Sequence, residues 1–152
     1  MCIRDRCKAE LITMAEKFGL KRVSFEDPVP KREIPALAAQ ADAFVFNLIN
    51  APVFKYGISS NKLFDFMAGQ RPVLFCCDAG NNPIEDSRAG YTVQPGNPEA
   101  LADAVARLTR LPSEDRAAMG RAGRRYVEVE HGFDKLAGSL AGCLNEACES
   151  SR

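Results

Sequence analysis

The sequence predicts an α/β fold in which a Rossmann-like parallel sheet is flanked by helices. Short apolar runs alternate with segments of helical periodicity along most of the chain. Two of these runs, residues 43–49 and 72–77, are apolar almost throughout, as strands covered on both faces are. Strands that alternate with helices are typical of parallel βαβ units. In an open sheet of this kind, ligands bind where loops leave the carboxyl ends of the strands.

The N-terminal part is predicted to form a helix, a strand and a second helix. Apolar residues recur at helical spacing between Leu11 and Phe18, and Gly19 stands where a C-terminal glycine cap is expected. A short strand is predicted over residues 22–25, ended by Asp27-Pro28. A second helix is predicted around residues 34–38, with Pro35 in its first turn.

The central and C-terminal parts continue the alternation. Strand 43–49 leads through a long loop, residues 51–60, into a helix over residues 61–67 that Gly69 ends. Strand 72–77 is followed by a short helix that starts at Asn82-Pro83, with Glu85 completing the N-terminal signal. A strand at residues 91–93 precedes a helix that opens at Asn97-Pro98. Two further helices are predicted over residues 113–130 and 133–148.

Composition excludes several functional classes. The chain has 152 residues, enough for one domain, and its 20 basic residues balance 20 acidic ones, so no basic field attracts nucleic acid. No apolar run reaches the roughly 18–20 residues of a membrane-spanning helix. The six cysteines form no CxxC pair, and one histidine, His131, has no neighbouring ligand set, so we expect reduced thiols and no metal. No nucleophilic triad can be assembled around one histidine.

Residues 1–6, Met-Cys-Ile-Arg-Asp-Arg, lack periodicity and a helix cap. They resemble the translated end of a sequencing adapter and are set aside as an expected artefact. The region of interest is therefore residues 7–152. On this interpretation, Met1 is not a natural start and the chain is a piece of a longer protein.

The loop and helix around residues 56–62 carry the clearest ligand-binding signal. Gly57 permits a tight turn after the loop from the first buried strand, and Ile58 follows it. Ser59, Ser60 or Asn61 can cap the following helix. Because the first N–H groups of a helix lack internal partners, this is an anion site, to which Lys62 adds a full charge.

Asp65 stands one turn inside that helix, on the same side as Lys62. A carboxylate there can accept two hydrogen bonds from a ribose diol, as the acidic residue of dinucleotide-binding folds does. The alternative is structural: an ion pair with Lys62, or favourable placement near the helix N-terminus.

The run from Tyr56 to Val73, Tyr-Gly-Ile-Ser-Ser-Asn-Lys-Leu-Phe-Asp-Phe-Met-Ala-Gly-Gln-Arg-Pro-Val, resembles the donor-binding stretch of GT-B-fold glycosyltransferases of family 4. Bacterial surface-polysaccharide enzymes are the most similar branch. The match continues in order through residues 81–85, 89–93 and 96–101, and around Met119-Gly120-Arg121. The resemblance identifies residues 7–152 as an incomplete C-terminal, nucleotide-sugar-binding domain of a GT-B fold.

The resemblance also implies roles for individual residues. Asp65 matches the second acidic residue of the E-x7-E motif, which holds the nucleotide ribose, and Gly57 to Ser60 match the loop before the diphosphate-facing helix. Val29 matches a position that lines the nucleobase. The first glutamate of the motif is absent, because Gly57 stands eight residues before Asp65, and Ser60 replaces a common proline.

The function implied is transfer of a sugar, with retention, from a UDP- or GDP-sugar to a glycan or lipid-linked acceptor. The chain would bind the donor without metal or other cofactor, and a preceding domain would bind the acceptor. Because the reaction takes place between the two domains, we expect the chain to be inactive alone. The resemblance implies a cytoplasmic place, with peripheral contact to the inner membrane as an open alternative.

Two other functions stay open at this point. A sugar-nucleotide 2-epimerase would share the architecture and also bind a UDP-sugar at a helix N-terminus. A Rossmann-like module that binds a nucleotide or a protein without catalysis would explain the absence of a catalytic base. Arg121, Arg124 and Arg125 are either a basic patch for a membrane or lipid-linked acceptor, or a solvated helix face.

Overall fold

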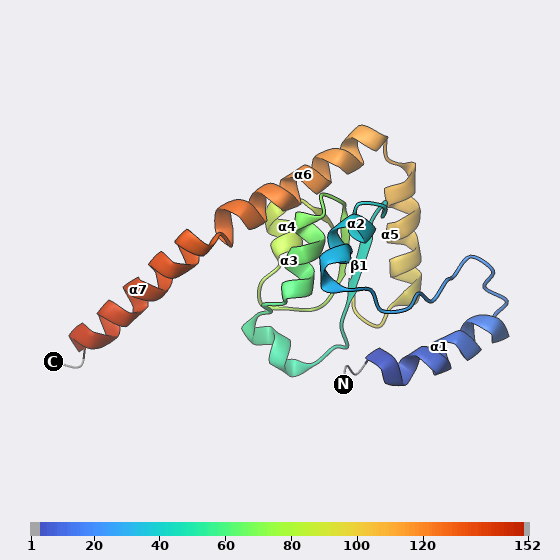
Figure 1. Ribbon diagram of the computed structural model, residues 1–152, viewed down its shortest axis with the longest axis horizontal. Coiled ribbons are helices and arrows are strands. Elements are labelled where there is room, and N and C mark those ends of the chain that lie inside the picture. The colour runs from blue at the N-terminus through green and yellow to red at the C-terminus, as the bar shows by residue number, and fades with distance from the viewer. Residues whose placement is uncertain (1–3, 151–152) are drawn as a thin grey trace. The chain divides into compact units, whose positions relative to one another are not determined.

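The computed structural model describes residues 4–150, which form two compact units, one up to Ile34 and the other from Pro35 onward. Helices and strands alternate in the second unit as far as residue 110, and the chain from there to residue 150 is helical apart from short connections (Figure 1).

The first unit contains helix α1, Arg4–Lys17, followed by turns and an irregular segment. The predicted glycine cap is confirmed, since Gly19 has φ +64° and its N–H donates to the carbonyl of Glu16. The predicted strand over residues 22–25 is wrong: this stretch begins in a turn, is otherwise irregular, and pairs with no strand within the described residues. Lys8 on α1 instead holds the segment through an ion pair with Asp27 at 2.8 Å.

Helix α1 begins at Arg4, so part of the segment that was set aside, residues 1–6, continues into this helix. Adding a residue to an existing helix costs little compared with nucleating one, so weak periodicity does not prevent extension. The adapter origin of these residues stays a prediction, and residues 1–3 lie outside the described part of the chain.

A three-stranded parallel sheet forms the centre of the second unit. Strands β1 (Phe44–Asn47), β2 (Val73–Cys76) and β3 (Gly90–Thr92) lie side by side in that order. Phe44 is paired with Val73, and Val73 with Gly90, so the three strands start in register. The predicted α/β fold with a parallel sheet is therefore confirmed.

The helices of this unit follow the sequence signals closely. They are α2 (Ile34–Ala38), α3 (Asn61–Ala68), α4 (Pro83–Ser87), α5 (Pro98–Arg110), α6 (Ser113–Glu130) and α7 (Phe133–Ser150). A short 3₁₀ helix, η2 (Pro52–Tyr56), is added within the predicted loop, and another, η1 (Lys31–Glu33), belongs to the first unit. The side chains of Asn82 and Asn97 cap α4 and α5 as predicted, accepting from the N–H groups of Glu85 and Ala100.

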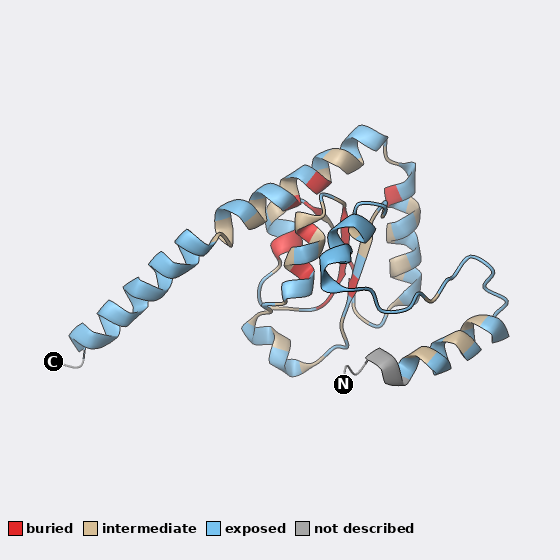
Figure 2. Ribbon diagram, in the orientation of Figure 1, coloured by how far each residue is buried: buried red, intermediate tan, exposed pale blue. Residues whose placement is uncertain are grey.

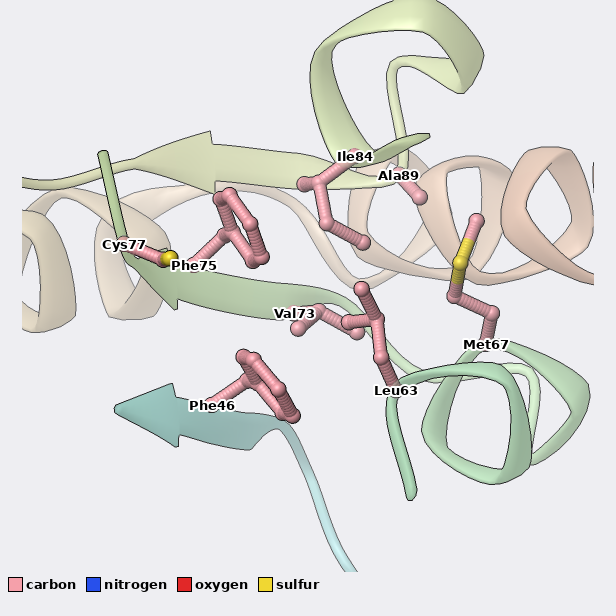
Figure 3. Close-up of a cluster of buried hydrophobic side chains, with 8 residues drawn as sticks. All are labelled: Phe46, Leu63, Met67, Val73, Phe75, Cys77, Ile84 and Ala89. Carbon is pink, nitrogen blue, oxygen red and sulfur yellow. The ribbon is translucent and has the colours of Figure 1, made fainter. Parts of the chain in front are cut away.

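One face of the sheet packs against α3, α4 and α6 (Figure 3). Phe46 and Phe75 on neighbouring strands stack with ring centroids 5.7 Å apart. Leu63 and Met67 on α3 are fully buried against this face, and Ile84 on α4 completes the cluster. The apolar spacing of α3 thus fixes which side of that helix faces the core and which side faces outward.

The opposite face of the sheet is covered unevenly. Helix α5 packs against β2, whose four residues are all buried, as predicted for this strand. The prediction that the strand in residues 43–49 is buried on both faces is wrong, because Val45 is 47% exposed and Ile49 81% exposed. Figure 2 shows the burial concentrated on β2, α3 and the adjoining part of α6, whereas α7 is exposed throughout.

No helix among residues 4–150 combines the length and the apolar composition that crossing a membrane requires.

Candidate functional site

The carboxyl ends of β1 and β2 lie at the same edge of the sheet, and a pocket opens between the loops that follow them. Its volume is about 270 Å³. The lining residues come from both loops: Asn50, Ala51, Pro52 and Lys55 from the first, and Asp78, Ala79 and Gly80 from the second. The edge predicted for ligand binding therefore carries a cavity with a cationic and an anionic side chain in its wall.

The two loops are joined to each other by hydrogen bonds. The N–H of Gly80 donates to the carbonyl of Phe54 at 2.9 Å. The side chain of Asn81 accepts from the N–H of Ile58 at 2.6 Å and donates to the carbonyl of the same residue at 3.0 Å. The loop that leads into α3 is thus held by the loop that follows β2.

Helix α3 starts without a side-chain cap. Ser60 occupies the N-cap position, but its hydroxyl makes no capping bond; its carbonyl accepts from the N–H groups of Leu63 and Phe64. Among the hydrogen bonds of the described residues, none uses the N–H of Asn61 or Lys62. Both residues are exposed, as is Ser59. Two backbone donors and one ammonium group therefore stand open at the positive end of the helix dipole.

Asp65 lies on the outward side of α3, between the buried Leu63 and Met67 in sequence, and is exposed. The structural alternative of an ion pair with Lys62 is not observed: within residues 4–150 the Asp65 carboxylate takes part in no ion pair and accepts no hydrogen bond. The carboxylate and the helix start are thus both accessible on one short helix.

Of the remaining predicted site residues, Gly57 and Ile58 belong to the second unit and Val29 belongs to the first. Gly57 ends η2 with φ +106°, a conformation that favours glycine, and half-buried Ile58 packs against the core. Val29 is 39% exposed and belongs to the first unit, so its role at a nucleobase stays a prediction. None of the sequence-predicted residues lines the pocket itself.

Neither the arginines nor the cysteines add an obvious ligand site. Arg121 pairs with Glu114 and Arg124 with Glu128, both on α6, which favours a solvated helix face over a lipid-binding patch. Burial raises the pKa of the Cys76 and Cys77 thiols, and the charge of Asp78 adds to the rise at Cys77. Among residues 4–150, no three His, Cys, Asp or Glu side chains gather where they could hold a metal ion.

The sequence indicated that ligands bind at the loops after the strands, but it did not indicate the residues that shape these loops. Lys55 and Asp78 in the pocket wall, and the contacts of Gly80 and Asn81, were not singled out. Asn81 and Ile58 are 23 positions apart, and no local pattern links residues so distant. The only available signal was that both loops leave carboxyl ends of predicted neighbouring strands.

The chain is similar to known proteins of one family. The family model described as "Glycosyl transferases group 1" matches residues 4–110. The GDP-mannose-dependent alpha-(1-6)-phosphatidylinositol monomannoside mannosyltransferase of Mycobacterium tuberculosis, matched in two strains, is 32% identical over 125 residues, which is 80% of this chain and 32% of that protein.

Among solved structures, the sucrose-phosphate synthase of Thermosynechococcus elongatus superposes with a TM-score of 0.76 and 17% sequence identity. The match covers 93% of this chain and 34% of the synthase, and it supports the fold. The chain thus spans about a third of the length of the proteins that it matches.

Proposed function

Because the chain belongs to the group 1 glycosyltransferases, the GT-B enzymes of family 4, we propose that it binds the nucleotide diphosphate of a sugar donor at the start of α3. The observation that carries the proposal is the uncapped end of this helix, where Lys62 stands beside two open backbone donors. Diphosphate oxygens are anionic acceptors, and such a helix end supplies both the donors and the favourable dipole.

Asp65 is proposed to accept hydrogen bonds from the two ribose hydroxyls of the donor. Its carboxylate is exposed and unpaired within the described residues, and it lies three positions after Lys62, on the same side of α3. A ligand that places its diphosphate at the helix start and its ribose along the first turn would satisfy both groups.

A GDP-linked sugar is the first donor to test. The mycobacterial relative is named as GDP-mannose-dependent, and its match covers 80% of this chain. For a protein with the full length of these relatives, the proposal extends to transfer with retention to a glycan or lipid-linked acceptor at the cytoplasmic side of a membrane. Since this chain spans about a third of its relatives, we expect it to bind the donor without transferring the sugar.

Isothermal titration of the purified chain with GDP, UDP and GDP-mannose tests donor binding. We expect Asp65→Asn to weaken GDP binding by about 5- to 150-fold, because a charge-assisted hydrogen bond contributes about 1–3 kcal/mol. Asp103→Asn, which neutralises an exposed carboxylate on α5, is the matched control and should bind as the unmodified chain does.

Two results would contradict the proposal. One is equal affinity of the Asp65→Asn and Asp103→Asn variants, which would make Asp65 a surface residue without a ligand. The other is transfer of labelled mannose from GDP-mannose to an acceptor by the 152-residue chain, which would show that catalysis needs no further domain.

A further inference from the structure

The side chain of Asn81 makes a two-point contact with one peptide unit of the neighbouring loop. Its Oδ1 accepts from the Ile58 N–H at 2.6 Å, and its Nδ2 donates to the Ile58 carbonyl at 3.0 Å. A single hydrogen bond would allow Ile58 to rotate relative to Asn81. Two bonds, to both backbone groups of Ile58, fix its orientation as well as its position. Ile58 lies three positions before α3 begins at Asn61.

The backbone around this contact is packed too closely to shift independently. A Cβ atom on Gly57 would lie 3.2 Å from Asn81 Oδ1, and one on Gly80 would lie 2.3 Å from the carbonyl oxygen of Lys55. Gly80 also donates its N–H to Phe54. Gly80 therefore meets the backbone of Lys55 at a distance that leaves no room for a side chain, whereas Gly57 lies tightly against the Asn81 side chain.

We propose that Asn81 is a positioning residue for the nucleotide-sugar donor: by holding Ile58, it sets the approach of the loop to α3 and thereby the direction of the open N–H groups of Asn61 and Lys62. The proposal rests on the donor site proposed above. Asn81 itself need not touch the ligand, since both polar atoms of its side chain are already used on Ile58.

A role in positioning differs from a role in stability. Asn81 is exposed, so water can replace its bonds to Ile58 when the side chain is removed, and the folded state should lose little. A diphosphate, in contrast, needs several donors aimed at once, and small displacements of such a set weaken binding strongly. The expected signature is therefore a loss of affinity that exceeds the loss of stability.

Asn81→Ala removes both bonds, and Asn81→Ser is a second variant with a residue that turns tolerate well. Asn97→Ala is the matched control: it also removes an asparagine side-chain bond to a backbone N–H, that of Ala100 at 2.9 Å, but at the start of α5. Each variant is titrated with GDP and melted, and backbone hydrogen exchange is followed at Ile58 and at the start of α3.

We expect both Asn81 variants to weaken GDP binding on the order of 10- to 100-fold. Asn97→Ala should stay within about twofold of the unmodified chain, as distant sites act independently. Amide exchange at Ile58 should accelerate in the Asn81 variants and not in Asn97→Ala. Unchanged GDP affinity in both folded Asn81 variants, or unchanged exchange at Ile58, would overturn the inference.

The two proposals fail in different ways. If the unmodified chain binds neither GDP nor UDP, the donor site is refuted, and the positioning role is refuted with it. If the unmodified chain binds GDP and Asp65→Asn weakens binding while the Asn81 variants do not, the donor site stands and only the role of Asn81 is wrong.

Discussion

Replacing Gly120 by alanine tests how α6 supports α3, the helix at which we propose donor binding. Helix α6 packs on α3, and Gly120 is buried where α6 crosses the turn that follows α3. A Cβ atom at this position would lie 2.1 Å from the carbonyl oxygen of Gln70 and 2.9 Å from the N–H nitrogen of Arg71. Both contacts are with backbone, which cannot rotate away as a side chain could.

Two opposing effects decide the result. Within a helix, alanine is favoured over glycine by about 1 kcal/mol. The contact with Gln70 falls 1.3 Å short of an ordinary 3.4 Å contact (3.4 minus 2.1), so α6 and the turn must separate. Overpacking of this kind costs about 1–3 kcal/mol, and a backbone clash this short belongs at the upper end. We therefore expect Gly120→Ala to lose about 2 kcal/mol of unfolding free energy.

Urea unfolding followed by circular dichroism measures this loss. The matched control is Gly142→Ala on α7, where an added Cβ meets no atom within 4 Å, so the variant should be as stable as the unmodified chain or gain up to about 1 kcal/mol. If Gly120→Ala is stabilised like Gly142→Ala, α6 does not approach the turn as closely as the structure has it, and the support of α3 by α6 is refuted.

Further predictions concern the thiols and the loop before α3. Because burial raises the pKa of Cys76 and Cys77, a thiolate-directed reagent at pH 8 should modify exposed Cys143 first, and labelling of the buried pair should grow only at higher pH; equal rates by mass spectrometry would contradict their burial. Gly57→Glu should lower the unfolding free energy by about 1–3 kcal/mol, because φ is +106° there, and should not strengthen GDP-mannose binding. A gain in affinity without loss of stability would refute this reasoning.

The features predicted correctly from the sequence are those that neighbouring residues determine. The caps at Asn82 and Asn97 depend on bonds to residues three positions ahead, and the glycine stop at Gly19 depends on its own φ. The burial of β2 was also readable, since a strand without polar residues has no face suited to water.

The errors concern what lies next to a segment in space. Residues 22–25 have the composition of a strand, but a strand exists only where a partner supplies a ladder of hydrogen bonds, and none pairs with them in the described part of the chain. Val45 is apolar, as covered residues usually are, but its side chain is exposed. Helix α5, which covers this side of the sheet, packs on β2. Local patterns report what a residue tolerates, not what covers it.

The candidate site depends both on residues that are neighbours in the sequence and on residues that are neighbours only in space. The run from Gly57 to Asp65 is contiguous in sequence, so its helix start, its charge and its carboxylate could be predicted together. The shape of the loop before it depends on Asn81 and Gly80, which follow a different strand. This dependence also bears on the residue at position 57. A side chain there would need a left-handed backbone and would crowd the Asn81 amide, so glycine at one position and asparagine at the other form one structural solution.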